Sequence, residues 1–275
     1  HNRAAMTRGW IAYGAGAAAQ SPAFVQGVRD AAAYYGRDAV IWAISVDPSY
    51  ARGLRGGQEA TRMLLESANA DSARIIDAAE RYRELSYSLQ RQRWANAVAP
   101  QQRERVQRVR ALAVQGAPAS AVPETYAPRL NATLLTHRPM QDPTAFGGRR
   151  FWDALSGAAE VTQVAAAPSS YQFRVNASRG EALDRMAAVA ALEALDASAT
   201  HQSTIATLLD DPRSRQCLEM SQLQLFQCMS AARFRYENTF CLSAHALRDV
   251  GECIGAVAQP GGETAMAPAA SGGRE

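Results

Sequence analysis

The sequence predicts an all-α fold: a helical bundle with one long central helix, a proline-rich excursion and a C-terminal helical hairpin stapled by disulfides. Three observations favour this class. Alanine is abundant, and aromatic residues make up only 7% of the chain. Such a composition, without alternating Val, Ile and Thr, favours helix over sheet. Apolar residues recur in steps of three and four over residues 58–98. All four cysteines lie within residues 217–253.

Length and composition set broad limits. With 275 residues, 47% of them hydrophobic, the chain is long enough to bury a core in one large domain or two small ones. Its formal net charge of +3 favours no particular partner. No stretch of about 18 apolar residues occurs, so no transmembrane helix is expected.

The N-terminal helical region is expected to span residues 1–115. Ser21 can cap a helix that begins at Pro22, and Gly36 is well placed to end it. Residues 38–46 are short and β-branched enough for a strand. We interpret them as buried helix, because no comparable strand lies nearby to pair with them. Gly56-Gly57 then breaks the chain before the longest periodic segment.

Residues 58–98 are predicted to form one helix about 60 Å long. Its heptad-like seam carries small and polar residues, which suits close packing within a bundle better than a free two-stranded coil. The seam consists of Leu65, Ala68, Ser72, Ile75, Ala79, Tyr82, Ser86 and Leu89. Pro100 ends this segment, and a second helix is expected over 101–114.

Residues 116–149 contain five prolines, and this composition indicates either a domain linker or a strap across the bundle surface. A C-terminal helical region is expected over 150–258. In it, Ser178-x-x-Glu181 resembles a capping box that opens a helix reaching about residue 197. Residues 259–275 are rich in Gly, Ala and Ser and are expected to be a disordered tail.

The cysteines are expected to staple a hairpin over residues 211–256. Cys217 and Cys228 are 11 residues apart, so on one helix they face the same way but lie about 16 Å apart. Each therefore needs a partner on another element. A turn near 234–238 would place Cys241 beside Cys228 and Cys253 beside Cys217. We favour this nested pairing over the two other connectivities.

One phase mismatch opposes it. Cys241 and Cys253 are 12 residues apart, about 120° out of phase on an ideal helix. We expect Gly251 to end the second helix, so that Cys253 turns inward. The pattern is similar to the twin Cys-x9-Cys helical hairpins of oxidising compartments, although the spacings here are x10 and x11. The resemblance covers residues 211–256 and implies a role in assembly or scaffolding.

The sequence offers little catalytic chemistry. Neither a Gly-x-Ser-x-Gly nor a Gly-x-Gly-x-x-Gly motif is present, and we predict no catalytic, cofactor-binding or metal-ligating residue. Cys241, His245 and Asp249 share a helical face, but zinc sites normally use close cysteine pairs, so we interpret His245 as an ordinary polar residue. Carboxylates at Asp71, Asp77, Glu80 and Glu84 are interpreted as a solvated helix face.

An arginine cluster is the best candidate binding feature. The cluster contains only one acidic residue, Glu104. It could bind an anionic lipid, an acidic polysaccharide or a partner protein, whereas a solvated surface is the plainer interpretation. Nucleic acid is not the expected partner. The cluster consists of Arg91, Arg93, Trp94, Arg103, Arg105, Arg108 and Arg110.

All 29 basic residues are arginine, which favours a high-GC bacterial genome. Paired cysteines then indicate a periplasmic or secreted protein whose signal peptide has been removed. The leading hypothesis is a non-enzymatic structural or assembly component of a cell-envelope complex, and homo-oligomers are possible. The alternatives are an envelope enzyme acting on peptidoglycan or polysaccharide, with acids gathered in a pocket, and a binder of anionic lipid or polymer through Arg91–Arg110.

Overall fold

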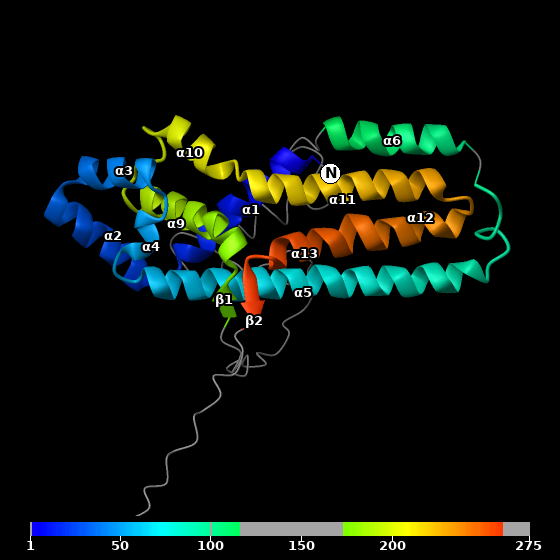
Figure 1. Cartoon of the computed structure of the whole chain (residues 1–275), viewed down its shortest axis with the longest axis horizontal. Helices are drawn as coiled ribbons and strands as arrows, with labels where there is room; N and C mark the ends of the chain where they lie inside the picture. The colour runs from blue at the N-terminus through cyan, green and yellow to red at the C-terminus, as the bar shows by residue number, and fades with distance from the viewer. Residues whose placement is uncertain (1, 100, 116–172, 261–275) are drawn as a thin grey trace, which may run out of the picture.

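The computed structural model describes residues 2–99, 101–115 and 173–260. Within them the protein is a helical bundle built along one long helix, α5, which spans Gly57–Gln90 (Figure 1). The predicted all-α class is confirmed. The predicted proline-rich segment 116–149, residues 150–172 of the predicted C-terminal helical region and residues 261–275 of the predicted tail lie outside the described residues.

One end of the bundle is formed by short helices around the N-terminal half of α5 (Figure 1). The start and end signals predicted for the helix at Pro22–Tyr35 are confirmed. The Ser21 hydroxyl accepts a hydrogen bond from the Phe24 N–H, Pro22 begins the helix, and Gly36 follows its last residue. Residues 38–46 are helical, as interpreted. These elements are α1 (Arg3–Ala18), α2 (Pro22–Tyr35), α3 (Arg37–Val46), α4 (Tyr50–Gly53), α9 (Gly180–Ala194) and α10 (Gln202–Leu209).

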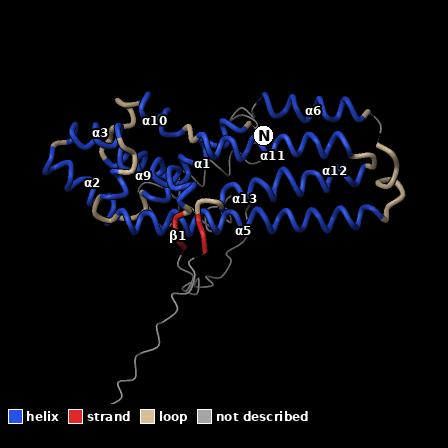
Figure 2. Tube along the Cα trace, viewed as in Figure 1, coloured by secondary structure: helices blue, strands red, loops and turns tan. Residues whose placement is uncertain are grey.

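The other end is built from α5, α6 (Gln102–Gln115), α11 (Pro212–Ala231) and a return segment. The return segment consists of α12 (Arg235–Cys241), the π-helical η3 (Leu242–Arg248) and α13 (Asp249–Gly255). Figure 2 shows the return segment next to α5, α11 next to the return segment, and α6 next to α11. The only strands in the described residues, β1 (Phe173–Val175) and β2 (Ala258–Pro260), form an antiparallel pair. Two residues assigned to the disordered tail, Gln259 and Pro260, therefore belong to a strand.

The main hydrophobic core joins helices from both sides of residues 116–172. Its largest fully buried side chains include Ile11 of α1, Phe24 of α2, Ile44 of α3, Leu64 of α5 and Leu183 of α9. Because α1 packs against α9 far along the sequence, the two helical regions share one core rather than forming separate ones.

The long helix ends earlier than predicted. It stops at Gln90, and at 34 residues it is about 51 Å long. The main chain of the following connector pairs with the α11–α12 turn instead: the Ala99 N–H donates to the Arg233 carbonyl at 2.9 Å, and the Tyr236 N–H donates to the Ala95 carbonyl at 3.2 Å. These hydrogen bonds satisfy backbone groups that a longer helix would have satisfied internally.

The start of α9 also differs from its predicted cap. Residues Ala177–Arg179 form a 3₁₀ turn, and the Asn176 side chain accepts the hydrogen bond from the Ser178 N–H. Ser178 is thus inside the turn and does not cap the helix. The Asn176 amide also donates to the Ala256 carbonyl at 2.9 Å, so a tertiary contact selects this residue over Ser178.

Candidate functional site

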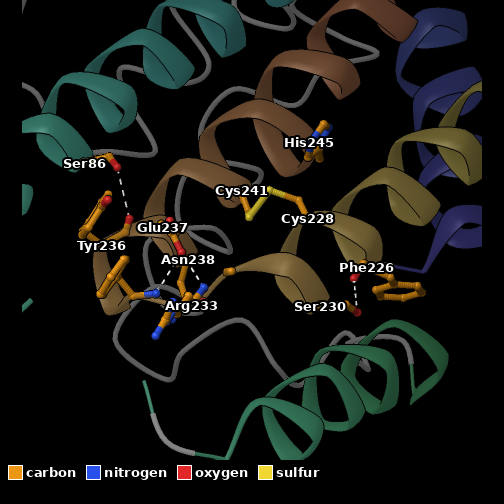
Figure 3. The surroundings of a disulfide bond; sticks show 12 residues. Ser86, Phe226, Cys228, Ser230, Arg233, Tyr236, Glu237, Asn238, Cys241 and His245 are labelled. Carbon is orange, nitrogen blue, oxygen red and sulfur yellow. Dashed lines mark hydrogen bonds between the residues drawn. A yellow bond between two sulfur atoms is a disulfide. The ribbon is translucent and has the colours of Figure 1, made fainter. Parts of the chain in front are cut away.

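The C-terminal hairpin is closed by two disulfides. Cys217 of α11 bonds Cys253 of α13. Cys228 of α11 bonds Cys241 of α12, as Figure 3 shows. The Cα–Cα distances are 5.8 and 5.6 Å, within the usual range for the bond. The nested arrangement is the one favoured from sequence. Asp211 caps the N-terminus of α11, because its carboxylate accepts a hydrogen bond from the Ser214 N–H at 2.8 Å.

The phase mismatch between Cys241 and Cys253 is resolved by η3. A π-helix closes i→i+5 hydrogen bonds, so it accommodates an extra residue that an α-helix would not. The wide turn takes up one residue, so the 12-residue step from Cys241 to Cys253 rotates through about the same angle as the 11-residue step from Cys217 to Cys228 on α11. The expectation that Gly251 ends the helix is wrong, since Gly251 lies inside α13. The helical phase between the two cysteines is instead adjusted upstream of Gly251, in Leu242–Arg248.

Neighbouring hydroxyls support this wide helical segment. Ser221 of α11 donates to the His245 carbonyl at 2.6 Å, and Ser243 of η3 donates to the Ala79 carbonyl of α5 at 2.9 Å. Both serines are buried. Because buried polar groups need partners, these two bonds fix η3 between α11 and α5.

The small residues of the predicted α5 seam face the return segment. Ser72, Ala79 and Ser86, spaced seven apart, are all buried. Ser86 donates to the Tyr236 carbonyl at 3.1 Å, and a side chain on Gly251 would come within 3.2 Å of the Ser72 carbonyl. The seam therefore permits close antiparallel packing. Tyr82 is the exception, with 46% of its surface exposed.

A cleft of about 490 Å³ lies between α1, α5 and α13. Its walls are mostly apolar, with one ion pair at the side, where Arg74 lies 3.6 Å from Asp71. The lining residues are Gly9, Trp10, Tyr13, Asp71, Arg74, Ile75 and Ile254. A ligand-sized volume with aromatic walls and few polar groups is typical of small-molecule sites.

Asp71 is the one carboxylate that lines this cleft. Burial raises its pKa above the ordinary 3.8, while hydrogen bonding to Tyr13 and the charge of Arg74 lower the pKa and only partly offset the rise. A glycosidase needs two carboxylates across the scissile bond. The described lining supplies one beside Trp10 and Tyr13, so it does not form the acid pair that the enzymatic alternative requires.

The carboxylates interpreted as one solvated face have different environments, so that interpretation is wrong for two of them. Asp77 is exposed and pairs with Arg81 at 2.8 Å, and Glu84 is exposed. Asp71 lines the cleft, and Glu80 forms ion pairs with Arg83 and with Arg248 of η3. Packing of α1 and η3 against α5 leaves these two side chains only partly exposed, 14% for Asp71 and 33% for Glu80.

The predicted arginine cluster is split by the structure. Arg105 donates to the Asn238 side chain at 2.6 Å and to the Ala232 carbonyl at 3.3 Å, and Arg110 lies over the Phe226 ring at 5.4 Å. These two arginines hold α6 against α11 and the turn. The members with exposed side chains are Arg91, Arg93, Trp94, Arg103, Arg108 and Arg110, whereas Arg105 is half-buried.

His245 has an ordinary polar partner. Its Nδ1 lies 2.8 Å from an Asp249 carboxylate oxygen, and Cys241 is committed to its disulfide. In the part of the chain that the structure describes, no group of three His, Cys, Asp or Glu residues is placed to hold a metal ion.

Comparison with known proteins gives no family for this chain. No family model, curated protein or solved structure matches it. None of the helices in the described residues is both long and apolar enough to cross a membrane.

Sequence reasoning missed the cleft and the position of Asp71 in its wall. Trp10 and Tyr13 lie on α1, Asp71 on α5 and Ile254 on α13, and no local pattern links these three helices. The available signal was weak: Asp71 is one residue from the buried seam position Ser72, at the edge of the apolar stripe.

Proposed function

We propose that this protein is a non-enzymatic structural or assembly component of a bacterial cell-envelope or secreted complex. It would bind partner proteins through the C-terminal half of α5 and the stapled hairpin. The observation that carries the proposal is a set of large apolar side chains exposed on these helices. They are Tyr82, Leu85 and Tyr87 of α5, Met220 and Leu223 of α11, Phe240 of α12 and Leu242 of η3.

Rigidity supports a docking role. Two disulfides join α11 to the return segment, and η3 is hydrogen bonded on both sides. A surface whose helices are already fixed loses little conformational entropy when a partner binds. Apolar side chains exposed on such a surface lose contact with water when a partner covers them, which adds binding energy.

The two disulfides support the proposed envelope or secreted location. Structural disulfides persist where thiols are kept oxidised, which in bacteria means the periplasm or the exterior. Alkylation of the protein from its native source, with and without reductant, tests this. We expect no modified cysteine without reductant and four with it. Four reactive thiols in native protein would contradict the envelope assignment.

The docking surface is tested by site-specific photo-crosslinking in the native host. A photoreactive residue at Tyr82 or Leu223 is expected to give one discrete adduct with a partner, whereas the exposed polar positions Glu84 and Gln227 serve as matched controls. The Tyr82→Ser/Leu85→Ser variant is expected to shift the native complex to the size of the free protein. An unchanged complex in that variant would overturn the proposal.

A further inference from the structure

Two segments far apart in the sequence meet at the end of the bundle where α5 stops. The α5–α6 connector pairs with the α11–α12 turn: Val98 and Phe234 form an antiparallel bridge, and the Arg235 N–H donates to the Ala97 carbonyl at 3.4 Å. Arg105 ties the first turn of α6 to the same place. Figure 1 shows this end of the molecule, which we call the distal face.

The distal face is strongly cationic. Arg91 and Arg93 come from the connector, Arg103 from the start of α6, and Arg233 and Arg235 from the turn, and all five are exposed. Of the nearby acids, Glu237 is used within the turn, where its carboxylate accepts from the Arg233 and Phe234 N–H groups. Glu104 is exposed and offsets one charge. Since the whole chain carries a net charge of +3, positive charge is concentrated here.

Large apolar side chains lie among these arginines. Trp94 is 58% exposed and Val98 is 59% exposed, both in the connector, and Tyr87 of the last α5 turns is 56% exposed. Tryptophan and tyrosine rings favour the boundary between lipid headgroups and acyl chains, where one part of the ring is apolar and another is wet. Arginine side chains can extend from that depth to reach phosphates.

We propose that the distal face docks on a bilayer surface containing anionic phospholipid, with Trp94 and Val98 in the headgroup region and the five arginines on lipid phosphates. Charge complementarity favours an anionic surface. The exposed tryptophan and valine favour lipid over an acidic polysaccharide, which offers phosphate-like charge without an apolar layer. The contact is peripheral and requires no membrane-spanning helix.

The experiment uses the purified full chain with its disulfides intact. Flotation is measured with vesicles of phosphatidylethanolamine and phosphatidylglycerol, and with phosphatidylcholine vesicles alone. We expect binding to the anionic vesicles only, falling as salt is raised. The variants Arg91→Gln/Arg93→Gln and Arg233→Gln/Arg235→Gln are each expected to weaken binding about 10- to 30-fold. The first tests residues seen as a cluster in the sequence, and the second tests residues that only the fold adds.

The matched control is Arg55→Gln/Arg62→Gln, which removes two exposed arginines at the opposite end of α5 and is expected to bind as the wild type does. Vesicles should also shift tryptophan emission to shorter wavelength, and Trp94→Phe should abolish most of that shift. Equal binding by both distal variants and the control would overturn the proposal. So would binding to an acidic polysaccharide without binding to anionic vesicles. Because no partner protein is present, either failure leaves the proposed assembly role standing.

Discussion

The Ser221 hydroxyl donates a hydrogen bond of 2.6 Å to the His245 carbonyl. This contact joins α11 to the π-helical segment at the level between the two disulfides. A carbonyl in a widened helical turn is met by a side chain from a neighbouring helix, so the local irregularity is stabilised by tertiary structure.

Removing that hydroxyl should therefore destabilise the hairpin. Ser221→Ala is expected to lower the free energy of unfolding by about 1–2 kcal/mol, because the buried carbonyl loses its partner. Ser88→Ala is the control, since its exposed hydroxyl bonds only the Leu85 carbonyl within its own helix. Urea denaturation measures both, and similar effects of the two substitutions would contradict this role for Ser221.

The helical phase of η3 gives a second prediction. Deleting Ala244 shortens the Cys241–Cys253 spacing to 11 residues, so the return segment can become a regular α-helix with both cysteines still facing α11. We expect both native disulfides to form on oxidative refolding. Deleting Gln227 instead removes a residue from a regular α-helix and should turn Cys217 away from its partner. Peptide mapping of the disulfides distinguishes the two, and mispaired cysteines in the Ala244 deletion would refute the phase argument.

The two disulfides should differ in their contribution to stability. Cys217–Cys253 closes a separation of 36 residues and Cys228–Cys241 one of 13. The loss of loop entropy in the unfolded chain predicts that removing the longer link costs about 1 kcal/mol more. Paired Cys→Ala variants of each bond, compared by urea denaturation, measure the difference. A larger loss on removing Cys228–Cys241 would show that native-state packing, rather than loop entropy, sets the order.

The buried carboxylate of the cleft predicts a pH dependence. Because burial raises the pKa of Asp71 above 3.8, the native state binds its proton more tightly than the unfolded chain does. Ionised Asp71 therefore destabilises the native state above its folded pKa, and the penalty is absent below pH 3.8. Asp71→Asn is expected to unfold at a higher temperature than the wild type at pH 7.

That advantage should shrink as the pH falls through the folded pKa of Asp71. Thermal melts between pH 3 and pH 7 measure it. Asp77→Asn, at an exposed ion pair with Arg81, is the control and should show no such trend. An Asp71→Asn variant less stable than the wild type at pH 7 would mean that the ion pair with Arg74 outweighs burial.

Local signals in the sequence determined most of the secondary structure. Ser21-Pro22 and Asp211-Pro212 place backbone acceptors and fixed φ angles where helices begin, so these starts could be predicted. The 11-residue spacing of Cys217 and Cys228 and the heptad spacing of Ser72, Ala79 and Ser86 follow from the helical repeat alone. These features depend on neighbours within a few turns of the same helix.

The tertiary structure alone decided where helical regularity breaks and which distant side chains meet. The π-helical turn of η3 exists because Ser221 and Ala79 hold it from other helices, and α5 ends at Gln90 because its connector pairs with the α11–α12 turn. Burial of Asp71 and the pairing of the α5–α6 connector with the turn that carries Arg233 likewise require segments distant in sequence to pack together. No local pattern records these contacts, because their free energy comes from packing that forms only in the folded chain.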